Sequence, residues 1–97
     1  MRVRYTRTAL AEIGEICAYI QRDNPRAAAE ISNAIERAVA WIARHPLSAP
    51  VVFENTVRAK LVGRFQYRIF YVAHDREIII RNVRSTKRRR PWETDEI

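Results

Sequence analysis

The sequence predicts a single α+β domain in which two helices pack on one face of an antiparallel sheet. Apolar residues recur at helical spacing within residues 8–22 and again within 25–44. Runs rich in β-branched and aromatic residues follow at 57–62, 67–73 and 77–83. A chain of 97 residues with 47% hydrophobic residues fits one folded domain and argues against disorder.

The N-terminal part predicts a strand and a first helix. Met1–Thr6 alternates arginine with valine and tyrosine, which indicates a short strand with one buried face. Thr8 is the predicted N-cap of the helix over residues 8–22. Gly14 inside this helix suggests close packing against a neighbouring element. The apolar stripe, expected in the core, comprises Leu10, Ile13, Ile16, Cys17 and Ile20.

A second helix is predicted to begin at Asn24 and Pro25. Asn24 suits the N-cap, and Pro25 suits the first helical position, where its missing N–H does no harm. Pro46 then ends the helix after about residue 44, and the short connection predicts an antiparallel helical hairpin. Val39 and Trp41 lie off the main stripe and form either a second buried face or an exposed patch for a partner. The stripe itself comprises Ala28, Ile31, Ala34, Ile35, Ala38 and Ile42.

The second half of the chain predicts a three-stranded antiparallel sheet. Residues 47–55 read as a loop, and residues 57–62 alternate apolar with basic side chains, which indicates a strand with one cationic face. Residues 67–73 and 77–83 flank a polar turn at 74–76, as in a hairpin. The acidic residues 93–97 are expected to fray. The expected order is therefore strand, helix, helix and three strands.

Positive charge gathers in this second half. The formal net charge is +7, and residues 57–90 hold eleven cations against Asp75 and Glu77. Six of the ten residues from Arg81 to Arg90 are basic, and sixteen of the eighteen cations in the chain are arginine. Arginine binds phosphate and carboxylate through a two-pronged contact. The pattern predicts that the chain recognises nucleic acid, an acidic protein, or both in turn.

The composition also limits the class of protein. One cysteine excludes an internal disulfide and a zinc site of several thiolates, so no metal and no cofactor are predicted. No apolar run approaches the ~18–20 residues of a membrane span, and no signal-peptide pattern follows the first charges. We therefore expect a soluble protein that stays in the cytoplasm.

The order of elements, together with three motifs, resembles the RelE/ParE superfamily of bacterial toxins over nearly the whole chain. The motifs are Tyr67-Arg68-Ile69-Phe70-Tyr71, Ile80-Arg81-Asn82-Val83 and Arg88-Arg89-Arg90, and the helix start at Asn24–Ala28 also fits. The resemblance implies the toxic half of a type II toxin–antitoxin system, such as those that stabilise plasmids, and a cognate antitoxin as partner.

The superfamily divides by target. RelE-like members cut messenger RNA on the ribosome with a group of lysines and arginines, often with a C-terminal tyrosine. ParE-like members lack most of that group and are described as poisons of DNA gyrase. By resemblance, a cleavage set here would comprise Arg58, Lys60, Arg68 and Arg88. Trp92 stands in place of the tyrosine, and Ser85 occupies the position where ParE-like members often have histidine.

The residues themselves leave that cleavage set incomplete. RNA cleavage by attack of the 2′-hydroxyl needs a base that removes the hydroxyl proton. Arginine stays protonated and is a poor base, and Lys60 could act as a base only after losing its own proton. His45 and His74 are expected at a helix end and in the hairpin turn, away from the set. Glu12 and Glu15 read as solvated helix residues rather than a catalytic pair. Catalytic residues therefore stay unassigned.

The leading hypothesis is a ParE-like toxin that binds and inhibits gyrase and is neutralised by an antitoxin with an acidic segment. The alternative is a RelE-like endoribonuclease that acts on ribosome-bound mRNA, and a third reading is an adaptor without toxicity. The residues expected to contact the target are Arg68, Arg81, Arg84, Lys87, Arg88, Arg89, Arg90 and Trp92. Those expected to contact the antitoxin are Ile13, Ile20, Ile31, Ile35, Val39, Trp41 and Ile42.

Overall fold

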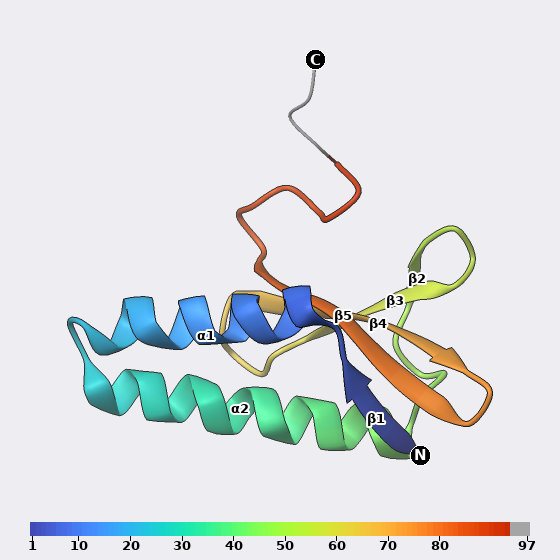
Figure 1. Cartoon of the computed structure of the whole chain (residues 1–97), viewed down its shortest axis with the longest axis horizontal. Coiled ribbons are helices and arrows are strands. Elements are labelled where there is room, and N and C mark those ends of the chain that lie inside the picture. The colour runs from blue at the N-terminus through green and yellow to red at the C-terminus, as the bar shows by residue number, and fades with distance from the viewer. Residues whose placement is uncertain (94–97) are drawn as a thin grey trace.

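Two helices and five strands make up the domain (Figure 1), and the computed structural model describes residues 1–93. Both helices precede four of the strands in the chain, as the periodicity predicts. The elements are β1 (Arg2–Tyr5), α1 (Arg7–Gln21), α2 (Pro25–Arg44), β2 (Val51–Phe53), β3 (Val57–Leu61), β4 (Tyr67–His74) and β5 (Glu77–Ser85).

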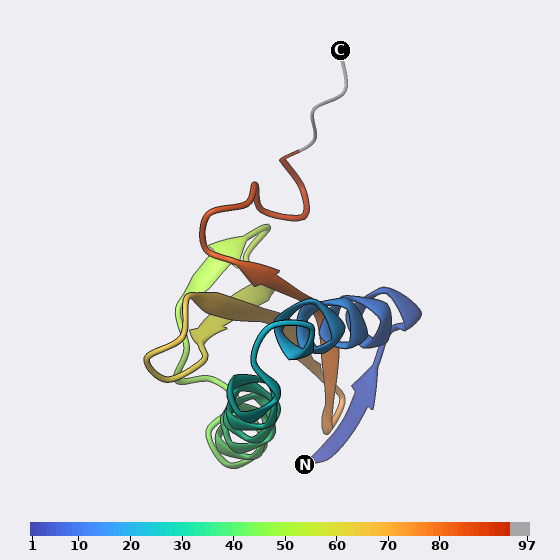
Figure 2. The ribbon, with the colours of Figure 1, turned by 90° about the vertical axis from the view of Figure 1, so that its left-hand side faces the viewer.

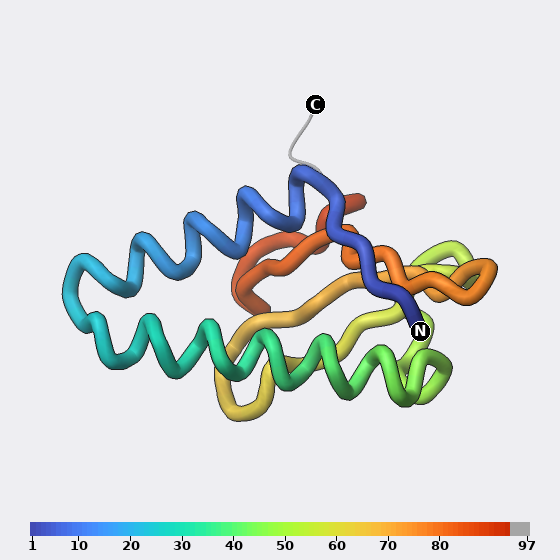
Figure 3. Tube along the Cα trace, turned by 60° about the horizontal axis from the view of Figure 1, so that its bottom comes forward, coloured from blue at the N-terminus to red at the C-terminus, as the bar shows by residue number. Residues whose placement is uncertain are grey.

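Capping side chains set where the helices begin. The Asn24 side chain accepts a hydrogen bond from the Ala27 N–H at 3.1 Å, and Pro25 opens α2, as predicted. Helix α1 is capped by Thr6 rather than by Thr8, because the Thr6 hydroxyl also donates to the Arg81 carbonyl at 2.8 Å. A contact with β5, which is far away in the sequence, therefore determines which residue is the N-cap of α1. The two helices run antiparallel, as Figure 3 shows.

The sheet is mixed and has five strands, in the order β1-β5-β4-β3-β2. Strand β1 pairs parallel to β5, and all other neighbours pair antiparallel. The predicted α+β class is thus right, but the three-stranded antiparallel sheet is wrong. Part of the predicted loop at 47–55 forms β2, which pairs with Val57 and Arg58 of β3. Strands this short have no periodic pattern, and only their partners define them.

The predicted hairpin of β4 and β5 is confirmed. Asp75 and Arg76 connect the strands with φ of 51° and 66°, the left-handed pair of a type I′ turn, whose twist matches that of the strands. The pairing slips at Phe70 and Tyr71, which face Asn82 and Ile80, so Arg81 has no partner residue on β4. The bulge leaves the Arg81 side chain exposed.

The main core lies between the helices and one face of the sheet. Ile31 and Ile42 of α2 are fully buried there against Ile69 and Tyr71 of β4. Gly14 does not belong to this core: it is exposed, and no atom of another element lies within 4 Å of where its Cβ would stand. The close packing expected at Gly14 is therefore absent from the described part of the chain.

A smaller cluster covers the opposite face of the sheet. Val57, Ala59 and Phe70 are buried there, with Phe53 and Trp92 packed against them. Figure 2 shows α2 on one side of the sheet and the C-terminal segment on the other. Because successive side chains of a strand point to opposite faces of the sheet, Ile69 and Tyr71 of β4 belong to the main core, whereas Phe70 between them belongs to the smaller cluster. The C-terminal segment is thus a third, partial layer of the fold.

Candidate functional site

The basic residues after β5 form a folded segment, which we call the cationic arm and define as residues 86–92. Its first turn is fixed by backbone hydrogen bonds: the Thr86 N–H donates to the Gln66 carbonyl at 2.8 Å, and the Arg88 N–H donates to the Ser85 carbonyl at 3.1 Å. The Ser85 hydroxyl accepts from the Lys87 N–H at 3.1 Å. These bonds hold the arm against the end of the β4–β5 hairpin.

Trp92 fixes the other end of the arm. Its ring stacks on Phe53, with centroids 4.3 Å apart and planes 9° apart, and meets Phe70 edge-on at 5.5 Å. The Arg90 guanidinium lies 5.9 Å from the Trp92 ring centroid. One face of the indole is therefore used within the chain, so Trp92 is first an anchor of the arm rather than the free contact residue that the sequence suggested.

Replacing Trp92 with alanine is expected to release the arm and to leave the rest of the domain folded, because the main core lies on the other face of the sheet. Trypsin cleavage at Lys87–Arg90 should then accelerate by about tenfold, since cleavage follows local opening. Trp92→Phe, which keeps the stack on Phe53, is the control and should be cut at the rate of the wild type. Equal cleavage rates for all three proteins would show that the indole does not anchor the arm.

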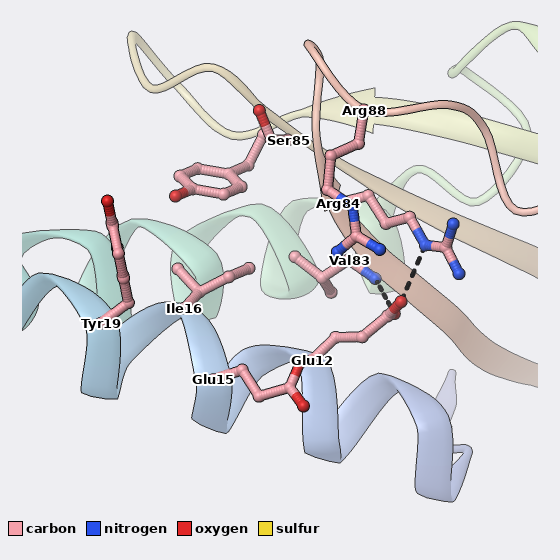
Figure 4. A pocket seen from close by; sticks show the side chains of 9 residues that line it. Glu12, Glu15, Ile16, Tyr19, Val83, Arg84, Ser85 and Arg88 are labelled. Atoms are coloured by element: carbon pink, nitrogen blue, oxygen red, sulfur yellow. Dashed lines mark hydrogen bonds and ion pairs between the residues drawn. The ribbon is translucent and has the colours of Figure 1, made fainter.

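Glu12 of α1 connects the helix to the base of the arm (Figure 4). This residue is only 8% exposed. Its carboxylate accepts from the Val83 N–H at 2.9 Å, from Arg84 Nε at 2.8 Å and from Asn82 Nδ2 at 3.2 Å. Strand β1 pairs with β5 only as far as Ile80, so Glu12 satisfies a backbone donor that no strand among residues 1–93 covers. Three donors on one buried carboxylate make a strong, charge-assisted junction.

Arg84 continues this junction into the arm. Besides its 2.8 Å ion pair with Glu12, it donates from Nη1 to the Arg89 carbonyl at 3.4 Å. The side chain of Arg84 is 21% exposed, so it supports the arm more than it presents charge. The prediction of a solvated Glu12 is wrong, because residues 12 and 82–84 meet only in the folded chain. No pattern in the sequence predicts the contact between Glu12 and residues 82–84.

The remaining cations of the predicted target set lie at the surface. Arg81, Lys87, Arg88 and Arg89 are exposed, and Arg90 is half-buried beside Trp92. Arg81 lies on β5, and the other four lie in the arm, which is held at both ends, so these charges sit on a defined backbone rather than on a free tail. Such a segment loses less conformational entropy when it binds an anionic partner.

A hollow of about 310 Å³ lies at the base of the arm. Figure 4 shows Ile16 and Tyr19 of α1 on one side of it and Arg88 on the other. Tyr67 and Val83 add apolar surface, and Glu15 adds a carboxylate. Tyr19 is 69% exposed, so its ring offers apolar surface in a hollow that Arg88 also lines. This combination suits an amphipathic peptide segment more than a polar small molecule.

The structure separates the residues of the predicted cleavage set. Lys60 and Arg68 line one groove, while Arg88 lines the hollow at the base of the arm. Arg58 is used internally: its Nη1 donates to the carbonyls of Ala49 at 2.7 Å and Leu47 at 3.1 Å. Arg58 is thus occupied by carbonyls of its own chain, and Arg88 lines a different hollow from Lys60 and Arg68.

Tyr71 lies beside Arg58 in the same internal network. The Tyr71 hydroxyl donates to the Pro46 carbonyl at 2.8 Å. Burial raises the pKa of Tyr71 above its usual 10.0, and the Arg58 guanidinium opposes that rise. This phenol therefore stays protonated near neutral pH and does not supply the base that the cleavage set lacks. Arg58 and Tyr71 instead fix the loop between α2 and β2.

The side chains predicted to bind an antitoxin lie mostly in the core. Ile31, Ile35, Val39 and Ile42 are between 0% and 7% exposed, and Ile13, Ile20 and Trp41 pack against the same core. The prediction is therefore wrong for the four buried residues, because periodicity alone does not distinguish a core stripe from a docking stripe. Ile13, Ile20 and Trp41 are partly exposed, and their contact with an antitoxin stays a prediction. Leu10 and Tyr19 of α1 are 56% and 69% exposed instead. The prediction of a buried Leu10 is also wrong.

Residues 1–93 lack both a membrane-spanning helix and a cluster of metal-binding side chains. No helix in this range is long and apolar enough to cross a bilayer. The same residues contain no group of three or more histidine, cysteine or acidic side chains placed to hold a metal ion.

Comparison with known proteins gives three likenesses. A family model described as the ParE toxin of the type II toxin–antitoxin system parDE matches residues 3–90. The chain is 35% identical over 79 residues to a protein of Sinorhizobium fredii named "Putative toxin Y4kP", and the match covers 80% of this chain and 82% of that protein. It also resembles a solved chain of the chromosomal ParDE system from P. aeruginosa, with a TM-score of 0.76 and 18% identity, over 88% of this chain and 95% of that one.

Proposed function

Since this chain belongs to the ParE toxin family of type II toxin–antitoxin systems, we propose that it arrests growth by binding and inhibiting DNA gyrase through its cationic arm. The observation that carries this proposal is the arm itself, anchored by Trp92 at one end and by the Glu12–Arg84 junction at the other. A short cationic segment with a fixed backbone is suited to bind an acidic surface on a large protein or on a protein–DNA complex.

Fixing the arm matters because charge alone gives little specificity. Exposed cations attract any anionic surface through long-range forces, which salt screens over about 8–10 Å. Specific binding needs donors at set positions, so that several charge-assisted hydrogen bonds form together. Arg88 and Arg89 meet this requirement, since the turn at Ser85 and the Arg84 bond to the Arg89 carbonyl fix their backbone.

The family also implies a partner. A toxin of a parDE system has a cognate antitoxin, and the net charge of +7 here favours an antitoxin segment that is acidic. Leu10, Tyr19 and the hollow at the base of the arm are the apolar surfaces that such a segment would cover. Gyrase acts on DNA in the cytoplasm, where we expect both complexes to form.

The endoribonuclease alternative has less support in the geometry. Arg58 is bound to two carbonyls, and Lys60 and Arg68 lie in a different depression from Arg88. No histidine lines either depression. General acid–base cleavage of RNA needs these groups within reach of one phosphate.

A supercoiling assay with purified gyrase tests the proposed target. The chain is expected to inhibit supercoiling at concentrations stoichiometric with the enzyme, and the purified antitoxin should restore it. Programmed ribosomes incubated with the same preparation should keep their mRNA intact. If supercoiling is unaffected while mRNA is cut, the target is the ribosome and the gyrase proposal is wrong.

A further inference from the structure

A groove between β3, β4 and the end of the arm is lined by three cations. Its volume is about 430 Å³, and Lys60, Arg68 and Arg90 line it together with Trp41 and Leu61. All three cations are half-buried, and no acidic residue among residues 1–93 lines the groove. A cleft lined by charges of one sign concentrates ions of the opposite sign. The groove is therefore a candidate site for a small anion.

Sheet register places Arg68 opposite a second arginine. Arg68 of β4 pairs with Leu61 of β3 on one side and with Arg84 of β5 on the other. Directly opposed side chains lie on one face of the sheet, about 5 Å apart at Cβ, and like charges in such a pair repel. Arg84 has a counter-charge, since its Nε lies 2.8 Å from the Glu12 carboxylate. Arg68 has no ion pair within residues 1–93, so an anion beside it would relieve the repulsion.

The arm lies over the face of the sheet that carries Arg68. Alternate residues of a strand share a face, so Arg68 lies on the same side as Phe70. Phe70 meets Trp92 of the arm edge-on, with ring centroids 5.5 Å apart (Figure 2). The Glu93 carboxylate accepts from the Arg90 backbone N–H at 3.0 Å and makes no ion pair with its guanidinium. An anion in the groove would thus contact the sheet through Arg68 and the arm through Arg90.

We propose that Lys60, Arg68 and Arg90 bind the phosphate dianion of a small molecule, and that this anion links the arm to the sheet. Each arginine offers phosphate two parallel hydrogen bonds, and Lys60, held 4.5 Å from the Trp41 ring centroid, adds a point charge. A dianion compensates two of the three charges, whereas a single carboxylate compensates one. The inference rests on the proposed function only for its consequence, because the arm is the surface proposed to contact gyrase.

Two sources supply this dianion: inorganic phosphate, and the 5′-phosphate of a mononucleotide whose base would use the apolar surface at Leu61. Isothermal titration of the full chain at about pH 8 distinguishes them, with potassium chloride holding the ionic strength constant. The probes are inorganic phosphate, adenosine 5′-monophosphate and, as a control without phosphate, adenosine. Both phosphate compounds should bind and adenosine should not. Tighter binding of the nucleotide by tenfold or more assigns the site to nucleotides, and equal affinity assigns it to free phosphate.

Variants of the groove test which residues hold the anion. Arg68→Gln and Arg90→Gln should each weaken phosphate binding about tenfold, and Arg68→Lys, which keeps the charge but not the two-pronged contact, about threefold. Arg26→Gln, at the exposed start of α2, should bind as the wild type does. Without phosphate, Arg68→Gln should melt no lower than the wild type, since it removes one of two opposed charges. A merely structural role of Arg68 would lower that melting temperature.

Trypsin cleavage at Lys87–Arg90 measures the link between anion and arm. Saturating phosphate should slow cleavage of the wild type about threefold and leave that of Arg68→Gln unchanged, because cleavage follows local opening of the arm. An unfolded substrate, cut at equal rates with and without phosphate, controls for effects on trypsin itself. Neither gyrase nor cell growth enters these measurements, so their failure is distinguishable from failure of the proposed target.

Four results would overturn the proposal. The first is absence of phosphate binding, and the second is equal phosphate affinity of Arg68→Gln and the wild type. The third is phosphate binding that leaves the cleavage rate of the arm unchanged. The fourth is displacement of phosphate by an oligothymidylate without a terminal phosphate that binds at least tenfold more tightly through Arg68, which would make the groove a nucleic-acid site.

Discussion

Replacing Lys87, Arg88 and Arg89 with glutamine is expected to abolish growth arrest and to weaken binding to gyrase by at least about 100-fold, since several charge-assisted contacts are lost at once. These three side chains are exposed and belong to the part of the arm between its two anchors. The variant should fold normally, because the core, the Glu12–Arg84 junction and the Trp92 stack do not involve their side-chain charges. Supercoiling inhibition and growth after induction measure the two effects.

A matched control separates the position of these charges from their number. Arg7, Arg26 and Arg37 are exposed on the helices, and replacing all three with glutamine removes the same amount of charge. This control should inhibit supercoiling as the wild type does, apart from a modest loss in association rate at low salt. If both variants lose activity equally, net charge rather than the arm carries the effect. If neither does, the arm is not the surface that binds the target.

Replacing Glu12 with alanine is expected to have the largest effect on stability, about 2–4 kcal/mol, because it leaves buried donors without their acceptor. The Val83 N–H and the Arg84 guanidinium lose a partner at 2.9 and 2.8 Å, and Asn82 loses one at 3.2 Å. Urea unfolding measures the change. Glu15→Ala, on the exposed side of the same helix, should lie within about 0.5 kcal/mol of the wild type.

Glu12 variants also test whether the junction positions the arm. Glu12→Gln keeps an acceptor but loses the charge, so it should fold with a smaller loss of stability. Amide exchange at residues 88–90 should nevertheless accelerate, because Arg84 then holds the Arg89 carbonyl less firmly. A purely structural role would lower global stability without changing the exchange of the arm relative to the core. Unchanged stability in Glu12→Ala would contradict the junction itself.

The sequence alone determined the elements that depend on neighbouring residues. Asn24 and Pro25 cap and start α2 through contacts within one turn, so their prediction is confirmed. The β4–β5 hairpin follows from two β-rich runs and a polar turn. The position of the cationic cluster directly after the last strand can likewise be read from neighbouring residues in the sequence. Motifs in these same segments supported the resemblance to the toxin superfamily.

Only the tertiary structure decided how these elements meet. Thr6 rather than Thr8 caps α1 because its hydroxyl also reaches the Arg81 carbonyl. Glu12 is buried because residues 82–84 lie beside it, about 70 positions away in the chain. Arg88 lines a different hollow from Lys60 and Arg68, and no local pattern in the sequence indicates this. Periodicity reports which side of an element is apolar, but it contains no information on which distant segment covers that side. Packing between segments that are far apart in the sequence determines which segment covers it, and the candidate site consists of such contacts.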